Sequence, residues 1–193
     1  MIIIAIILVV LVLYVISFFN RLKTLQVQIK ASIQEIGNQL KRQADLIPNL
    51  VDSAKGYLAH EKGIMKMLSD ARTSVNSAVN SGDATKIDQA QSMINKALSS
   101  FKVIVESNPQ LQAAGVVTDL MNELRDTSDK VMYARRTLID LTADYNTSIA
   151  TIPGVWFAPA LGFQPEKGFE TPTSGEFLSV SSAETQTPKV KLN

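Results

Sequence analysis

The sequence predicts an all-α protein in which an N-terminal transmembrane helix continues into a long antiparallel four-helix bundle or coiled-coil hairpin. Residues 2–19 are apolar apart from Tyr14 and Ser17. From Leu22 onward, mostly apolar residues recur at alternating steps of four and three, the spacing that places them on one face of a helix. Neither Pro nor Gly separates the apolar run from this repeat, so one helix can pass from a membrane into water. No segment has the alternating pattern of a β-strand.

The helical repeat that follows the apolar run extends for about five heptads. Its polar members Gln26 and Gln43 either fix the register and number of packed helices or mark a part of the rod that the bundle leaves uncovered. Pro48 removes one helical hydrogen bond, but the apolar spacing continues in register, which predicts a kink rather than a helix end. A turn is expected at residues 57–63. The repeat consists of Leu22, Gln26, Ile29, Ile33, Ile36, Leu40, Gln43, Ile47, Leu50, Ala54 and Tyr57.

Three further helices are expected, at residues 64–79, 87–105 and 117–152, because apolar residues recur there at helical spacing. Between the first two, Gly82 suits the residue after a helix end, and Asp83 can cap the next helix by accepting from its free N–H groups. A short connection joins the last two helices.

These patterns divide the chain into four parts. They are a transmembrane anchor at residues 1–20, an antiparallel helical bundle at 21–153, an aromatic-rich segment near the membrane end at 154–170, and a Ser/Thr/Pro-rich tail at 171–193. The tail has no apolar periodicity and is expected to be mobile.

The aromatic-rich segment is expected to lie close to the bilayer surface. Rising and descending helices of the predicted lengths, at 1.5 Å per residue, return the chain to that level at Pro153. Trp156 and Phe157 would there suit an interfacial aromatic belt. The alternative is that Trp156, Phe157 and Phe163 plug the open end of the bundle.

The N-terminal run is interpreted as an uncleaved, single-pass anchor. Its length of about 18 residues is near the lower limit for crossing roughly 30 Å of hydrocarbon. A signal peptide would have a basic segment before a shorter apolar core and a small-residue cleavage site, whereas only Met1 precedes the run and residues 17–20 read Ser-Phe-Phe-Asn. Arg21 and Lys23 follow the run, so the positive-inside rule predicts that the bulk of the chain is cytoplasmic. Both side chains are close enough to touch lipid headgroups.

Composition and motifs argue against catalysis. The net charge of +1 gives no field to attract nucleic acid, and the lack of Cys excludes thiolate chemistry and cysteine metal sites. His60, the only histidine, has no partner for a zinc site or a catalytic relay. No Gly-rich phosphate loop occurs. We therefore expect no enzyme activity, cofactor, metal, nucleic-acid partner or small-molecule substrate.

A dodecapeptide at residues 40–51, Leu-Lys-Arg-Gln-Ala-Asp-Leu-Ile-Pro-Asn-Leu-Val, resembles the signature of the LemA family. The resemblance covers about residues 20–170 and excludes the tail after Glu170. It implies a membrane-anchored antiparallel helical bundle without assigned enzymatic activity, of a kind found in bacteria and some phages and often encoded near membrane proteases or TPM-domain proteins. Further matching residues are Lys55, Gly56, Tyr57, His60, Glu61, Glu106, Pro109, Leu111, Ala134, Arg135, Arg136, Tyr145, Asn146, Thr147, Pro153, Ala158, Gly162, Phe163 and Phe169.

The chain departs from the family pattern at two places. The family usually repeats the Tyr145-Asn146 pair seven residues earlier, where this chain has Leu138-Ile139, which puts in doubt a polar role for that pair. Gly37 stands where an acidic residue is common, which weakens any charged contact there.

Within the signature, Asp45, Pro48 and Asn49 form the candidate motif. They could present a polar notch to a partner protein at the proline kink. Structurally, the same residues would accommodate the kink, with a polar side chain satisfying a freed backbone group. The structural interpretation is preferred.

The predicted helix lengths suggest how the protein works. The first and last helices exceed the middle two by about 20 residues each, so the membrane-proximal half is expected to be a two-helix hairpin with too few partners to bury its seam. We expect a membrane-anchored scaffold that self-assembles as a homo-oligomer through this seam. The alternative is a monomeric adaptor or sensor that recruits an envelope protease or another membrane protein through the bundle tip around His60 or residues 108–109. The assembly seam consists of Leu22, Gln26, Ile29, Val131, Leu138 and Leu141.

Overall fold

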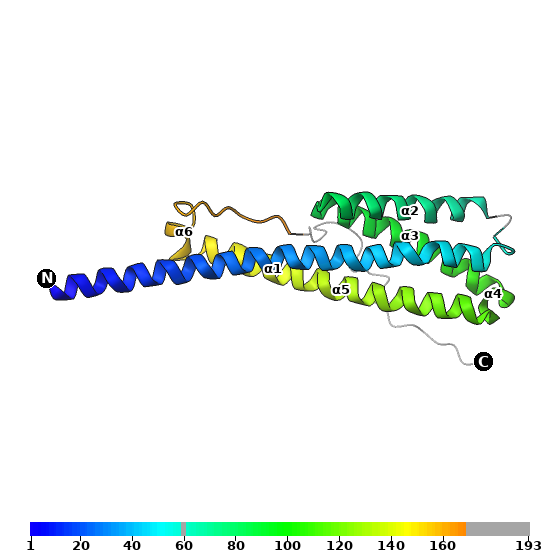
Figure 1. Cartoon of the computed structure of the whole chain (residues 1–193), viewed down its shortest axis with the longest axis horizontal. Helices are drawn as coiled ribbons and strands as arrows, with labels where there is room; N and C mark the ends of the chain where they lie inside the picture. The colour runs from blue at the N-terminus through cyan, green and yellow to red at the C-terminus, as the bar shows by residue number, and fades with distance from the viewer. Residues whose placement is uncertain (59–60, 169–193) are drawn as a thin grey trace, which may run out of the picture.

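The computed structural model describes residues 1–58 and 61–168, and over those residues the protein is built of helices without strands. It is an elongated body organised around helix α1 (Ile2–Ala54), which is 53 residues long and rises about 80 Å. Helix α5 (Gly115–Ala150) runs antiparallel beside α1 and forms the most extensive helix pair (Figure 1). The predicted all-α fold with a long apolar N-terminal helix and a helical bundle is confirmed.

Two shorter helices complete the bundle. α2 (Lys62–Ser81) and α3 (Ala84–Ser107) form an antiparallel pair that packs against the C-terminal half of α1 (Figure 1). The single turn α4 (Pro109–Ala113) lies at the far end of the bundle. The single turn α6 (Gly154–Phe157) lies at the opposite end, beside the N-terminal part of α1. The α1–α5 hairpin therefore extends well beyond α2 and α3, as the helix lengths predicted.

Helix α1 continues through Pro48, as the uninterrupted apolar spacing predicted (Figure 1). It ends at Ala54, however, one turn before Tyr57, the last predicted position of the repeat. After this end, Leu58 is fully buried, whereas Tyr57 is 40% exposed. The assignment of Tyr57 to the packed face is wrong because helical periodicity stops where the helix stops.

A glycine and two polar side chains cap the helices where the chain turns. Gly82 ends α2 in the left-handed region with a φ of 63°, a conformation that favours glycine. Asp83 then caps α3, accepting from the backbone N–H groups of Thr85 at 2.8 Å and Lys86 at 3.1 Å. Asn108 caps α4 in the same way, so the expected short connection contains a helical turn of its own.

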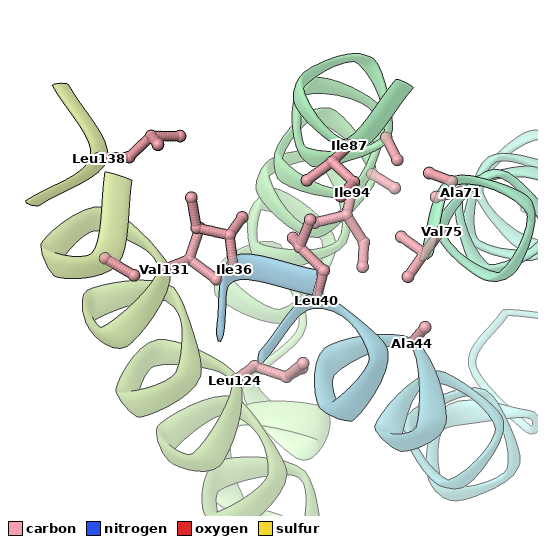
Figure 2. Packing of buried hydrophobic residues seen from close by; sticks show 14 of the residues in the cluster. Ile36, Leu40, Ala44, Ala71, Val75, Ile87, Ile94, Leu124, Val131 and Leu138 are labelled. Carbon is pink, nitrogen blue, oxygen red and sulfur yellow. The ribbon is translucent and has the colours of Figure 1, made fainter. Parts of the chain in front are cut away.

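The core follows α1, which supplies side chains to both layers of the bundle. In Figure 2, Ile36 and Leu40 of α1 lie between α5 on one side and the α2–α3 pair on the other. Burying each such aliphatic side chain contributes roughly 1.5–3 kcal/mol relative to leaving it in water. Their labelled neighbours in this cluster are Ala44, Ala71, Val75, Ile87, Ile94, Leu124, Val131 and Leu138.

Candidate functional site

The seam of the α1–α5 hairpin is buried within the single chain. Gln26 and Leu141 are half-buried. The other seam residues are at most 4% exposed, namely Leu22, Ile29, Val131 and Leu138. The expectation that the seam lacks partners until another subunit covers it is therefore wrong.

Two parts of the same chain lie against the hairpin beside its long helices. Asp88, near the start of α3, forms an ion pair with Arg135 of α5, which brings α3 to the level of Val131 and Leu138. Residues 154–168, here called the return segment, fold back along the hairpin from its end. Helical periodicity describes only helices, so it carried no signal for this irregular segment.

A polar cluster joins the return segment to both long helices. The side-chain amide of Gln26 on α1 donates to the hydroxyl oxygen of Tyr145 at 3.3 Å and to Oε1 of Glu166 at 3.1 Å. The Tyr145 hydroxyl in turn donates to the backbone carbonyl of Gln164 at 3.0 Å. Gln26 is therefore satisfied by α5 and the return segment of its own chain.

Asn146 holds the return segment through its backbone. Its Nδ2 donates to the carbonyl oxygen of Glu166, and its Oδ1 accepts from the N–H of Glu166, both at 3.0 Å. The adjacent residues Tyr145 and Asn146 of α5 thus both bind the return segment, and Tyr145 also binds Gln26 of α1. A Cβ added to Gly168 would lie 3.1 Å from Cγ2 of Thr142, so the segment stays close to α5 up to that point.

Burial raises the pKa of the Tyr145 phenol, and the nearby carboxylate of Glu166 raises it further, while the hydrogen bond from Gln26 acts in the opposite direction. Each of the first two causes disfavours the phenolate. Tyr145 is therefore held in its neutral form, in which the hydroxyl can donate to Gln164 and accept from Gln26 at the same time.

Aromatic rings and one cation extend the contact toward the apolar run. Phe163 is 4% exposed, and its ring centroid lies 5.4 Å from that of Phe19. The ammonium of Lys23 lies 5.1 Å from the Phe163 centroid and 5.7 Å from that of Phe19, within cation–π range. Gly162 precedes Phe163 with a φ of 78°, which lets the chain turn so that the ring enters the hairpin.

The aromatic residues of the return segment differ in their burial. Phe157 is half-buried and its ring lies 6.4 Å from that of Tyr14, centroid to centroid. Phe157 and Phe163 therefore close the end of the hairpin. Trp156 is 65% exposed, and Arg21 is also exposed.

The candidate motif in the signature lies apart from this cluster. Asp45 and Asn49 are exposed on α1, and Pro48 is half-buried against α2. The hydroxyl of Ser53 donates to the carbonyl oxygen of Asn49 at 2.7 Å. Gly37, the other departure noted, is buried, and a Cβ added there would lie 3.5 Å from Val79, so an acidic side chain would enter apolar surroundings.

Titratable residues do not gather into a ligand set: in residues 1–58 and 61–168, no group of three or more His, Asp or Glu side chains is placed to hold a metal ion. By length and composition, α1 contains a stretch apolar enough to cross a membrane, and its first turns project from the bundle without covering side chains.

Comparison with known protein families shows to which family the chain belongs. A model of the LemA family matches residues 32–191. The chain belongs to the LemA family. The match includes residues 171–191 of the tail, so the expectation that the tail lies outside the LemA resemblance is wrong. The structure of that tail lies outside the described residues. A comparison with curated proteins found no match.

Several residues that resemble the LemA pattern meet in the cluster just described. The Tyr145-Asn146 pair lies on α5 and the Gly162-Phe163 pair in the return segment, yet all four residues help to hold the return segment against the hairpin. Glu166, which sequence reasoning missed, completes the contact. Its isolated position in an irregular segment gave no periodic signal.

Proposed function

We propose that this LemA-family protein is a single-pass, membrane-anchored and non-catalytic scaffold whose copies assemble on the membrane surface. The observation that carries the proposal is the continuity of α1, which passes without a break from an exposed apolar run into the centre of the bundle. Because one helix serves as both anchor and core, the bundle is held rigidly relative to the membrane. The basic residues Arg21 and Lys23 favour a cytoplasmic bundle.

Assembly is supported by the anchor itself, which confines all copies to two dimensions and raises their local concentration. The contact surface must lie outside the buried hairpin seam. We assign it to α5, where the consecutive residues Met132 and Tyr133 are 63% and 76% exposed. Adjacent exposed side chains of these two types suit a subunit interface, because aromatic residues and Met are enriched in such interfaces.

The test is the particle size of the full-length protein extracted with its lipid, measured by mass photometry and negative-stain microscopy. Wild-type protein should form large, regular particles, and the double substitution Met132→Glu with Tyr133→Glu should reduce them to monomers. Val103→Glu on α3 is a matched control, because Val103 is 64% exposed and belongs to another helix. A monodisperse wild-type monomer would overturn the assembly proposal.

A second candidate function is a monomeric adaptor that recruits a membrane protein such as an envelope protease. It is favoured by the burial of the seam within one chain and by an open groove of about 550 Å³ between α3 and α5. Leu98 and Met121 provide apolar surface in this groove, and Lys102 and Arg125 provide positive charge.

The absence of native Cys makes a crosslinking test of the adaptor clean. A photocrosslinker attached through Asn122→Cys in the groove should capture one membrane protein with monomeric protein, while the same label at Val27→Cys should not. Crosslinks between copies of the chain would instead support the scaffold.

A further inference from the structure

Helix α6 lies beside the apolar run itself. The ring of Phe157 contacts that of Tyr14, with centroids 6.4 Å apart, and a Cβ added to Gly154 would lie 3.0 Å from Cζ of Phe18. Both contacts are made to the last two turns of the run at residues 2–19. Figure 1 shows α6 next to this part of α1, at the far end of the molecule from α4.

The length of the run fixes the level of α6 relative to a bilayer. If the bilayer ended below Tyr14, the remaining residues 2–13 would rise only about 18 Å, far less than the roughly 30 Å of hydrocarbon. The whole run, residues 2–19, rises about 27 Å, which comes close to this thickness. Residues at the level of Tyr14 and Phe18 must therefore lie at or within the membrane boundary, and so must α6.

The surface of residues 152–157, which include α6, fits such a position. Ile152, Val155 and Trp156 are 71%, 43% and 65% exposed, and residues 151–163 contain no charged side chain. Trp is favoured at the boundary between headgroups and hydrocarbon because its ring is apolar and its N–H can stay hydrated.

The backbone of α6 is also prepared for a medium with little water. The N–H groups of Val155, Trp156 and Ala158 donate to the carbonyl oxygens of residues 151, 153 and 154 at 2.8–3.1 Å. Unsatisfied backbone groups are costly in a bilayer, so this internal pairing permits insertion. Lys23 lies one turn beyond Phe19, about 6 Å farther from the membrane centre, at the level of the headgroup phosphates.

We propose that residues 152–157 are a second membrane contact, with Ile152, Val155 and Trp156 inserted into the interfacial layer of the bilayer that α1 crosses. Lys23 and Arg21 meet the headgroups directly above. This inference rests on the membrane anchoring in the proposed function but not on self-assembly. Two contacts at different points fix the rotation of α1 about its own axis, which a lone helix cannot do.

Trp156 is the only tryptophan in the chain, so its fluorescence reports this site alone. The full-length protein is reconstituted in phosphatidylcholine–phosphatidylglycerol vesicles that carry doxyl groups at shallow or deep acyl positions. We expect blue-shifted Trp156 emission and a greater loss of intensity with shallow than with deep doxyl groups. Unquenched emission, or greater loss with deep groups, would overturn the interfacial position.

A matched control moves the tryptophan to the other end of the molecule through Trp156→Phe with Tyr57→Trp, since Tyr57 is 40% exposed beyond the end of α1. This variant should float with the vesicles yet remain unquenched. Flotation separates the two proposals: protein that floats with unquenched Trp156 overturns only the second contact, whereas protein that fails to float overturns the anchor as well. Spin labels at Val155→Cys give an independent depth by their accessibility to oxygen and nickel chelates.

Discussion

Asn146 and Glu166, twenty residues apart, exchange two hydrogen bonds of 3.0 Å in which the side-chain amide of Asn146 pairs with the backbone of Glu166. An amide side chain here takes the place of a neighbouring β-strand, because it offers one donor and one acceptor in the same geometry. The irregular return segment is thereby fixed to a regular helix.

Replacing Asn146 should therefore release the return segment. We expect Asn146→Ala to lower the free energy of unfolding by about 1–3 kcal/mol, the net contribution of two partly buried hydrogen bonds. Hydrogen exchange at residues 160–168 should accelerate, while the exchange rates of α2 and α3 should be unchanged. Asn122→Ala, at an exposed position of the same helix, is the control. Equal exchange in both variants would contradict the role of Asn146.

Alkaline pH should weaken the same contact through Tyr145. Its folded pKa lies above the ordinary value of 10.0, mainly because of burial. The unfolded state therefore loses its proton first, and the stability contributed by the neutral phenol is complete below pH 10 and is lost as the pH rises through the folded pKa. The thermal unfolding temperature should fall more steeply above pH 10 in wild type than in Tyr145→Phe. Parallel curves for the two proteins would refute this.

Gly154 should tolerate no side chain. A Cβ at this position would overlap the backbone carbonyl oxygen of Ser148, which cannot move independently of α5. We expect Gly154→Ala to displace α6 and to cost about 1–3 kcal/mol, the usual cost of overpacking. Circular dichroism measures the stability and Trp156 fluorescence the displacement. Gly115→Ala serves for comparison, because a Cβ there meets nothing within 4 Å; similar behaviour of both variants would argue against the steric explanation.

A substitution at Pro48 can distinguish the structural from the functional interpretation of the candidate motif. Because α1 continues through this residue, Pro48→Ala should restore a helical hydrogen bond and stabilise the protein by up to about 3 kcal/mol. If the motif with Asp45 and Asn49 only accommodates the proline, particle formation should survive the change. A more stable protein that no longer assembles would show that the motif is functional.

Leu138→Asp should act on folding rather than on association. Leu138 is 1% exposed inside the single chain (Figure 2), so a buried, unpaired carboxylate would destabilise each subunit by several kcal/mol. Thermal unfolding in dilute detergent, where subunits are separated, measures this directly. An unchanged unfolding temperature there would restore Leu138 to a role between subunits.

The sequence predicted the helices well because each long helix has a one-sided apolar pattern. Ile36, Leu40 and Leu50 were assigned to the packed face of α1 from spacing alone, and all are at most 1% exposed. Thr127 and Thr142 of α5 are also buried, but their hydroxyls hid them from an apolar pattern. Thr127 satisfies its hydroxyl by donating to the carbonyl oxygen of Leu124 at 2.9 Å.

The candidate site was less predictable, since its contacts join distant positions by means other than periodicity. Gln26 was recognised as a polar residue in an apolar repeat, which either fixes the register of the packed helices or marks an uncovered part of the rod. Its hydrogen bond to Tyr145 shows that α5 covers this part of the rod, while Glu166 adds a partner that no pattern indicated. Irregular segments are held by particular side-chain contacts, which no periodic pattern in the sequence predicts.

The unbroken course of α1 also makes the molecule a lever. About 35 residues of this helix lie beyond the apolar run, a length of roughly 52 Å. A change of about 10° in the angle of the spanning part would move the far end of the bundle by about 9 Å, because a stiff helix transmits rotation without absorbing it. Where the bilayer is thinner than the apolar run, the run can match it by tilting, and this tilt would displace α4 sideways.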